Sequence, residues 1–333
     1  MKFQVYRTHA SSYQDSKYLA NEKKILEDIS DVEYIQTLQQ YAAGSKLILL
    51  TNTHTNTELI PRRILQETVL LVHPNSGHDN ISEEFRKSVD FPIIVGNPIS
   101  ANAVAEYTLA SIFQHFSMIP NHHHWQTDRN FPRKLLRDQK VVIIGHGTIG
   151  KIVASSLYPL CPKLQVYDPF KDLQHIPYPV INDWNNEIIK GANIVIIAAS
   201  LNNTSHRFLD SEKISQVAAD CLVINPARGE IVDEEALLQF LQKNPKSRAF
   251  LDVFKKEPFE PGFAGQISNL NKTSHIAGMY HKLNSDIVSF EYLVIKDFIE
   301  KYKQNSLASF KTDYEECLLP GDNLDGNKVS PSS

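Results

Sequence analysis

Short apolar runs alternate with amphipathic polar segments along the first hundred residues of the chain. The apolar runs contain β-branched and aromatic side chains and are predicted to be strands, at residues 3–6, 32–37, 46–51, 69–73 and 91–95. Helical patterns occur between several of them, at 17–29 and 82–88. Strands and helices in alternation predict a parallel sheet that has helices on both faces.

A second strand–helix series follows a long amphipathic helix that is predicted to begin near Ala101. This helix comes just after Pro98, with Ser100 or Asn102 as its N-cap. Several of the later strands, such as 141–144, are continuous apolar runs, which is typical of parallel strands buried on both faces. The predicted strands lie at 141–145, 164–168, 192–200, 221–227 and 248–254, with helices at 150–160 and 232–243.

The chain has 333 residues, which is long for one compact domain. The two series predict two α/β domains with parallel sheets, one flavodoxin-like and one Rossmann-like. A helix at 285–303 is expected to pack back on the first domain, so this substrate-binding domain is discontinuous and comprises 1–100 and 282–310. The second domain, 101–281, is predicted to bind a dinucleotide, and the polar segment 311–333 is expected to be a flexible C-terminal tail.

Composition argues against several classes of protein. With 34 basic and 38 acidic side chains the formal net charge is −4, so electrostatics gives no reason to expect a nucleic acid or an anionic membrane as partner. The longest apolar stretch, near 194–199, is far shorter than the roughly 20 residues of a membrane span, and the N-terminus has no apolar leader segment. The three cysteines lack metal-ligand spacing and fit a reducing compartment, so we expect a cytoplasmic protein without a metal site.

The strongest local signal is the segment from Gly145 to Gly150, which has the spacing G-x-G-x-x-G. It follows a predicted strand and opens a predicted helix, which is the context in which such glycines bind a dinucleotide. Gly145 permits the tight turn, Gly147 the close approach of a pyrophosphate, and Gly150 the packing of the helix on the strand. Thr148 and Ile149 begin the helix, whose free N–H groups would face the phosphates.

An acidic residue completes the predicted dinucleotide site. Asp168 ends the next strand, close to the position about 20 residues after the glycines where a carboxylate binds the ribose hydroxyls. Because a carboxylate there repels a 2′-phosphate, we expect NAD rather than NADP as the cofactor. The alternative is a structural glycine turn in some other doubly wound protein.

Three later segments each carry a side chain suited to keto-acid chemistry. Arg228 follows a strand in an Asn-Pro-Ala-Arg-Gly turn, Glu257 lies just past another strand, and His275 follows a loop rich in Gly and Asn. Taken singly, they have structural alternatives: a surface arginine, a solvated carboxylate and a histidine satisfied in the core. Together they fit one reaction, because reducing a 2-keto acid needs a cation for the carboxylate, a proton donor for the carbonyl oxygen and a group that orients this donor.

The segments GHGTIG, VYDPF, NPARGEIVDEEAL, LDVFKKEP and SHIAG, in this order, resemble the D-isomer-specific 2-hydroxyacid dehydrogenases. That family includes phosphoglycerate, D-lactate and glyoxylate/hydroxypyruvate dehydrogenases, and the resemblance runs from about residue 69 to residue 296. It implies a reversible hydride transfer between NADH and a small 2-keto acid, which gives a D-2-hydroxy acid. In this scheme Arg228 binds the substrate carboxylate, and His275 is the acid/base whose pKa Glu257 raises.

The resemblance also implies further cofactor contacts and an assembly. Asp252 matches a family aspartate that contacts the nicotinamide, and Pro226, Ala227 and Ala277 match stretches that line the cofactor. The family implies a cleft between the two domains and a homodimer. Where the family often has a proline before the catalytic histidine, this chain has Ser274, a change that affects the rigidity of the loop.

Two segments of the first domain bear on the substrate. Ser76 and Gly77 belong to a stretch that resembles the loop whose backbone amides hold the substrate carboxylate. Asn52 and His54 lie near the point where phosphoglycerate-type members commonly place an arginine, and they are expected to shape the pocket. The missing arginine argues against a phosphorylated substrate.

Other functions stay open at this stage. A non-catalytic NAD(H)-sensing dimer, like the C-terminal-binding-protein corepressors, shares this fold, and so do formate dehydrogenases. The histidines at 122–124 invite a metal interpretation, but adjacent histidines on a helix point in different directions, which favours a solvated or interface segment. Trp125 beside them is expected to reach a neighbouring subunit, as an aromatic residue near this point does in related dimers.

Overall fold

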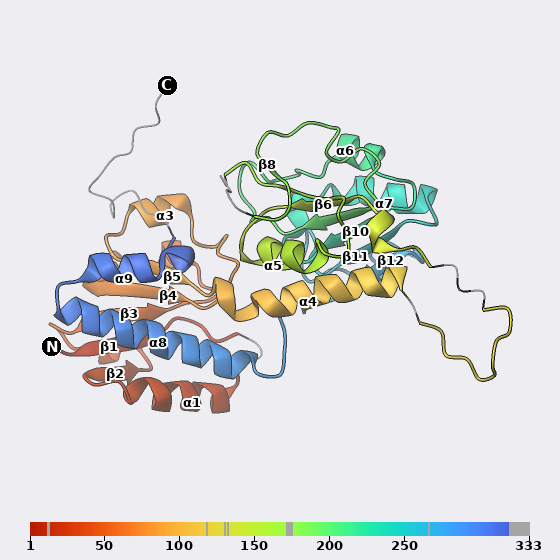
Figure 1. The fold of residues 1–333 in the computed structure, drawn as a ribbon. Coiled ribbons are helices and arrows are strands. Elements are labelled where there is room, and N and C mark those ends of the chain that lie inside the picture. Colours follow the sequence, from red (N-terminus) through yellow and green to blue (C-terminus); the bar gives the residue numbers. More distant parts are fainter. Residues whose placement is uncertain are drawn as a thin grey trace, which may run out of the picture. The chain divides into compact units, whose positions relative to one another are not determined.

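The computed structural model describes residues 1–11, 14–117, 119–129, 131, 133–170, 176–265 and 267–319. The chain divides into two compact units, and each contains one parallel sheet (Figure 1). The first unit comprises 1–100 and the chain from 280 onward, and the second comprises 101–279. The chain therefore crosses twice between the units.

The first unit is built on a five-stranded sheet in the order β2-β1-β3-β4-β5. All its strand pairs are parallel, and this order is that of flavodoxin-like doubly wound sheets. The parallel sheet predicted from the apolar runs is therefore confirmed. The strands are β1 (Phe3–Arg7), β2 (Val32–Ile35), β3 (Lys46–Leu50), β4 (Thr68–His73) and β5 (Ile93–Val95).

Helices from both ends of the chain cover this sheet. The long helix α8 lies along the sheet (Figure 1). Its residues Val294, Ile295 and Phe298 are buried in the same apolar cluster as Val5 and Ile48 of the sheet. The first domain is therefore discontinuous, as predicted. The helices are α1 (Ser16–Glu27), α2 (Arg62–Glu67), α3 (Glu83–Lys87), α8 (Leu283–Lys303) and α9 (Leu307–Asp313), with 3-10 helices at Leu38–Gln40, Thr57–Leu59 and Glu315–Cys317.

The second unit is built on a seven-stranded parallel sheet in the order β12-β11-β10-β9-β6-β7-β8. Counted from β6, this is the Rossmann order with one further strand at an edge, and the order reverses between β6 and β9. The strands are β6 (Val141–Ile144), β7 (Leu164–Tyr167), β8 (Val180–Ile181), β9 (Ile194–Ile197), β10 (Leu222–Asn225), β11 (Arg248–Leu251) and β12 (Leu270–Lys272). The helices are α4 (Asn97–Phe116), α5 (Thr148–Leu157), α6 (Ser211–Gln216) and α7 (Glu234–Lys243), with 3-10 helices at Leu136–Asp138 and Gly229–Ile231.

The pleat of β6 explains its continuous apolar run. Val141 and Ile143 lie in one buried cluster, whereas Val142 and Ile144 lie in another. Alternate side chains of a strand point to opposite faces of its sheet, so a strand covered on both faces needs apolar residues throughout.

Two boundaries differ from the prediction. Helix α4 begins at Asn97 rather than near Ala101, because Pro98 fits the first turn of a helix, where its missing N–H is not needed. The segment predicted as a tail from 311 is ordered in part. Helix α9 runs to Asp313, and Cys317 and Leu319 are buried in the first unit, while residues 320–333 lie outside the described part of the chain.

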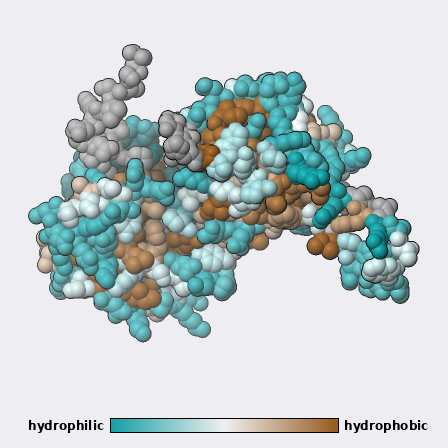
Figure 2. All heavy atoms as spheres, viewed as in Figure 1, coloured by the Kyte–Doolittle hydropathy of each residue, from teal (hydrophilic) through white to brown (hydrophobic). Residues whose placement is uncertain are grey.

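The surface in view is mostly hydrophilic, with hydrophobic side chains scattered over it (Figure 2). Among the described residues, no helix is both long enough and apolar enough to cross a lipid bilayer.

Candidate active site

The three glycines after β6 have three different surroundings. Gly145 has φ +100°, and a Cβ placed on it would lie 2.6 Å from the backbone of Ala199. A Cβ on Gly150 would lie 2.1 Å from the carbonyl oxygen of Gly145. A Cβ on Gly147 would meet no described atom within 4 Å, so this position faces open space where a ligand can approach the backbone. The fold therefore requires glycine at positions 145 and 150, whereas Gly147 leaves space for a ligand beside the backbone.

The helix that follows presents unpaired N–H groups at the same place. Helix α5 begins at Thr148, and its N-cap, Gly147, has no side chain with which to cap it. The first N–H groups of a helix, here those of Thr148, Ile149 and Gly150, have no partner within the helix and lie at its positive end. This arrangement suits a phosphate group.

Asp168 lies beside this loop, at the carboxyl end of β7. Its Oδ2 accepts the N–H of His146 at 2.8 Å, and its Oδ1 accepts that of Phe170 at 2.9 Å. Each carboxylate oxygen can accept a second bond, so the ribose hydroxyls of a nucleotide would still find acceptors. A cavity of about 210 Å³ is lined by Gly145, Asp168 and residues after β9 such as Ser205. The residues present therefore fit NAD.

His275 and Glu257 form the predicted pair. The imidazole Nδ1 lies 2.8 Å from Glu257 Oε2, and Glu257 Oε1 accepts the N–H of Phe254 at 2.9 Å. The hydrogen bond with Glu257 raises the pKa of His275, against burial and the opposing charge of Arg228. Burial opposes ionisation of Glu257, but its bonds with His275 and Phe254 outweigh burial and lower its pKa. The pair therefore favours an imidazolium beside a carboxylate.

Arg228 is held in the turn that follows β10. Its Nη1 donates to the carbonyl of Ala227 at 2.8 Å, and its own carbonyl accepts from Asn225 Nδ2 at 2.9 Å. Its positive charge acts on the pKa of both His275 and Glu257. The fold of the second unit thus brings together the three side chains that motif analysis selected.

The carboxylate of Asp252 supports the turn that bears His275. Asp252 directly follows β11 and is fully buried. Its oxygens accept the N–H groups of Ile276 and Ala277, each at 2.7 Å, and the hydroxyl of Thr273 at 2.6 Å. These bonds leave Asp252 Oδ2 with one protein partner, so the contact of Asp252 with the nicotinamide stays a prediction.

Ser76 and Gly77 lie in the first unit, in the loop after β4. The Gly77 carbonyl lies 2.9 Å from His73 Nε2, and the other ring nitrogen of His73 lies 3.0 Å from the hydroxyl of Thr51. The Ser76 hydroxyl lies 3.3 Å from that of Ser100. His73 is fully buried, and its contacts with Gly77 and Thr51 hold this loop in place.

Other predicted residues have different surroundings. Asn52 is buried, and its side chain donates to the His9 carbonyl and to Ser11 Oγ, so it holds loops together rather than facing a substrate. His54 is exposed. The histidines at 122–124 are also exposed. Among the described residues, no three or more His, Cys, Asp or Glu side chains lie close enough together to hold a metal ion.

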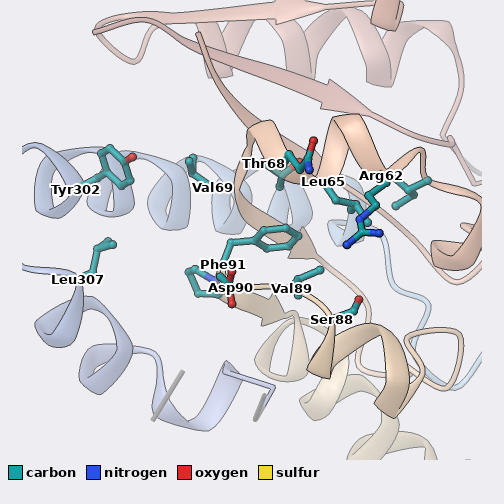
Figure 3. Close-up of a pocket in the computed structure, with 13 residues that line it drawn as sticks. Arg62, Leu65, Thr68, Val69, Ser88, Val89, Asp90, Phe91, Tyr302 and Leu307 are labelled. Atoms are coloured by element: carbon teal, nitrogen blue, oxygen red, sulfur yellow. The ribbon is translucent and has the colours of Figure 1, made fainter. Parts of the chain in front are cut away.

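A cavity of about 820 Å³ lies elsewhere in the first unit, at the amino ends of β4 and β5 (Figure 3). Its wall combines apolar side chains such as Leu65 and Phe91 with the guanidinium of Arg62. None of the predicted site residues lines it. Ligands of parallel sheets bind at the carboxyl ends of strands, so we do not assign this cavity to the reaction.

Sequence reasoning missed three residues that shape the site. The Tyr107 hydroxyl lies 2.9 Å from Thr273 Oγ1, although the two residues are 166 positions apart, and no motif links them. Gly229 lies within a recognised segment, but its role depends on contact with Phe254: a Cβ there would come within 2.0 Å of the Phe254 carbonyl carbon. Such contacts between distant segments leave no local pattern in the sequence.

Comparison with known proteins assigns the fold to a family. A sequence model described as "D-isomer specific 2-hydroxyacid dehydrogenase, NAD binding domain" matches residues 108–277. The chain belongs to this family. The dehydrogenase is therefore an oxidoreductase, and its cofactor is NAD.

Individual relatives are distant. The (S)-sulfolactate dehydrogenase of Chromohalobacter salexigens is 26% identical to the dehydrogenase over 258 residues, which are 74% of this chain and 82% of that protein. The D-lactate/D-glycerate dehydrogenase of Pediococcus acidilactici is 25% identical over 191 residues, which are 55% of this chain and 57% of that protein. A solved D-lactate dehydrogenase from Aquifex aeolicus, complexed with NAD and lactic acid, has a TM-score of 0.67 and 18% identity, and covers 93% of this chain and 98% of that chain. The solved structure shares the fold of this chain, but at these identities the relatives do not identify its substrate.

Proposed function

We propose that the dehydrogenase interconverts a small 2-keto acid and the corresponding D-2-hydroxy acid. The observation that carries this proposal is the contact of 2.8 Å between His275 and Glu257, next to the charge of Arg228 and in the unit that holds the dinucleotide loop. A proton donor, its orienting carboxylate and an anion-binding cation are the groups that this reaction needs.

Each side chain has a distinct role in the proposed reaction. The guanidinium of Arg228 binds the substrate carboxylate and polarises the adjacent carbonyl. The imidazolium of His275 donates its proton to the carbonyl oxygen during reduction, and the neutral ring takes it back during oxidation. Glu257 holds Nδ1 of this ring, which leaves Nε2 for the substrate. Bound NAD supplies the hydride acceptor or donor at its nicotinamide ring.

The remaining predicted contacts are part of the same proposal. We propose that Pro226, Ala227 and Ala277 line the cofactor, in addition to the glycine loop and Asp168. In the first unit, we propose that Ser76 and Gly77 offer backbone N–H groups to the substrate carboxylate. A Cβ at Gly77 would hinder this close approach, so Gly77→Ala is expected to raise the KM for the keto acid more than it lowers kcat.

A substrate panel tests the proposed function. The protein is mixed with NADH and either glyoxylate, hydroxypyruvate, pyruvate or longer branched 2-keto acids, and NADH absorbance is followed. Turnover of at least one acid is expected, with a loss on the order of 10²–10⁴-fold in His275→Ala. No turnover across the panel would refute the proposal, and NADH-dependent capture of a partner protein without turnover would favour a corepressor-like role.

We further propose a homodimer in which Trp125 contacts the neighbouring subunit. The Trp125 side chain is 80% exposed, and Ile119 and Phe113 nearby in the sequence are also exposed. Large exposed apolar side chains close together in a segment mark an interaction surface more often than isolated ones do. Sedimentation should show a dimer that weakens in Trp125→Ala, and unchanged dimerisation and KM would contradict this role.

The surroundings of the cysteines underlie the proposed cytoplasmic location. All three are free and buried, and burial raises the pKa of Cys161 to about 11. Buried thiols of raised pKa are unreactive. Free cysteines that form no disulfide are usual in a reducing compartment such as the cytoplasm. Fractionation of the native host cell would test this location.

A further inference from the structure

The backbone of His275 adopts an unfavourable conformation. Its φ is +54°, in the left-handed region that side chains with a Cβ seldom occupy. The residue before it is Ser274, which does not restrict the backbone as a proline would. Such a conformation persists only when the surrounding contacts impose it, so these contacts also set the position of the imidazole.

Asp252 provides most of these contacts. Its backbone carbonyl accepts the N–H of His275 at 2.9 Å, and its carboxylate accepts the next two N–H groups, those of Ile276 and Ala277. Three successive backbone N–H groups are thus fixed by one residue. Asp252 is itself tied to the sheet, since its N–H donates to the carbonyl of Asn225 at 3.1 Å.

The hydroxyl of Thr273 connects this carboxylate to another element. Thr273 has one hydroxyl hydrogen, and it donates this hydrogen to Asp252 Oδ1 at 2.6 Å. The Tyr107 hydroxyl, 2.9 Å away, must therefore be the donor to Thr273. The result is a directed chain of hydrogen bonds from Tyr107 through Thr273 to Asp252, and from there to the turn at His275.

The hydrogen-bonded series begins close to the point where the polypeptide crosses between the two units. Tyr107 lies on α4, the helix in which the chain first crosses between the two units, after Ser100. The second crossing, after Met279, comes only four residues beyond His275. On the side of the first unit, the Tyr280 hydroxyl lies 3.1 Å from the carbonyl of Ile99. In each unit, a tyrosine hydroxyl thus contacts one residue near the first crossing and one near the second.

We propose that Tyr107 and Thr273 are positioning residues for His275: they hold Asp252, and through it the turn, so that the imidazole meets Glu257. The inference rests on the proposed function, in which His275 moves the proton. Neither residue touches the reacting atoms in this scheme. Losing the Thr273 hydroxyl removes one of the hydrogen bonds that the Asp252 carboxylate accepts, and losing the Tyr107 hydroxyl removes the donor that holds Thr273 from α4. Either loss loosens the turn, which moves the imidazole away from its partner.

Removal of single hydroxyl groups tests the proposal. We would compare Tyr107→Phe, Thr273→Val and Thr273→Ser with the wild type by NMR titration of histidine-labelled protein without cofactor, identifying the His275 signal by its loss in His275→Ala. In the first two variants the pKa of His275 should fall toward its ordinary value, because the bond with Glu257 that raises it weakens. Thr273→Ser keeps the hydroxyl and should titrate like the wild type.

Kinetics give a second measurement of the same effect. For reduction of an accepted keto acid, kcat should fall roughly tenfold in Tyr107→Phe and Thr273→Val, because small misplacements of a catalytic group are costly. The KM should change by less than about twofold, since neither hydroxyl binds substrate. The double variant should be no worse than the poorer single variant, because both act through one chain of bonds.

Tyr34→Phe is the matched control. The Tyr34 hydroxyl also makes a buried hydrogen bond, to Glu22 in the first unit, so its loss should lower Tm and leave the titration of His275 unchanged. If Tyr107→Phe and Thr273→Val lower only Tm and leave both the titration and kcat as in the wild type, the positioning role is refuted. The titration needs no turnover, so it decides this inference even if the panel of keto acids shows no activity.

Discussion

At the scale of single residues, the protonation of His275 depends on the carboxylate beside it. Glu257 raises the pKa of His275, so the imidazolium needed for reduction persists to higher pH than an isolated histidine would allow. Reduction should therefore be fully active below this raised pKa, and its rate should fall as the pH rises through it. Oxidation needs the neutral ring and has the opposite dependence.

Glu257→Gln tests this coupling. The amide keeps the size of the side chain but removes its charge, so the pKa of His275 should fall. The alkaline limb of the kcat profile for reduction should move to lower pH, while oxidation should extend to lower pH. Profiles of kcat in both directions give the measurement, and an unmoved alkaline limb would show that another group controls the proton.

Gly229 is a second residue whose role can be measured. A methyl group at this position meets the Phe254 carbonyl carbon at 2.0 Å and the Lys255 nitrogen at 2.3 Å, both of them backbone atoms. Gly229→Ala should lower the free energy of unfolding by about 1–3 kcal/mol, the usual effect of overpacking. It should also lower kcat, because Phe254 donates its N–H to Glu257. Wild-type Tm and kcat in this variant would show that the loop adapts at no cost.

At the scale of elements, sequence patterns located the strands with buried apolar side chains and missed two short strands that are partly exposed. All five predicted strands of the first sheet are present, including the three-residue β5, whose side chains are all buried. In contrast, β8 has two residues and β12 has three, all partly exposed, so neither gives a readable pattern. The motifs found His275, Glu257 and Arg228, whereas Tyr107 depends on a contact that only the folded chain creates.

The loop between β6 and α5 allows a paired test at this scale. Gly147→Ala adds a methyl group that meets no described atom, at a φ of −72° that alanine accepts, so stability should change by less than about 0.5 kcal/mol. The affinity for NAD should nevertheless fall about tenfold or more, because the methyl group occupies the space of the pyrophosphate. Calorimetric titration with NAD gives the measurement.

Gly150→Ala is the counterpart. Its methyl group meets the Gly145 carbonyl at 2.1 Å, so this variant should be destabilised by roughly 1–3 kcal/mol even without NAD. If both variants lose stability equally, the space beside Gly147 is not the ligand site that we infer.

At the scale of the whole molecule, a buried polar cluster joins the two ends of the chain. Arg7, at the end of β1, donates through Nε to both oxygens of Glu22, at 2.9 and 2.8 Å, and it also binds Glu291 of α8. The hydroxyls of Tyr18 and Tyr34 donate to Glu22 as well. Two carboxyl groups therefore share one guanidinium in a buried site.

The two carboxyl groups differ in protonation. Burial and the neighbouring charge of Glu22 raise the pKa of Glu291, whereas the bonds with Arg7 overcome burial and lower the pKa of Glu22. We therefore expect the proton of this pair on Glu291 and the negative charge on Glu22. A carboxyl whose pKa is raised in the folded state stabilises below its ordinary pKa, and this contribution is lost as the pH rises through the raised value.

Two isosteric substitutions separate these roles. Glu22→Gln leaves the buried Arg7 without its charged partner and should lower the free energy of unfolding by about 3–5 kcal/mol. Glu291→Gln replaces a neutral group by a neutral group, so its effect at neutral pH should be about 1 kcal/mol or less. Thermal unfolding across pH should also show a flatter alkaline side for Glu291→Gln than for the wild type. The reverse ranking of the two variants would place the proton on Glu22.

The return of α8 to the first sheet fixes the order in which the protein can mature on the ribosome. Strands β1 to β5 emerge first, yet one apolar face of their sheet stays uncovered until Val294, Ile295 and Phe298 of α8 have been synthesised. The second unit is continuous and is complete at residue 279, so it can fold while the earlier hundred residues still wait for their last helix. A nascent chain halted before α8 should thus carry a folded dinucleotide domain, while chaperones still bind its first hundred residues.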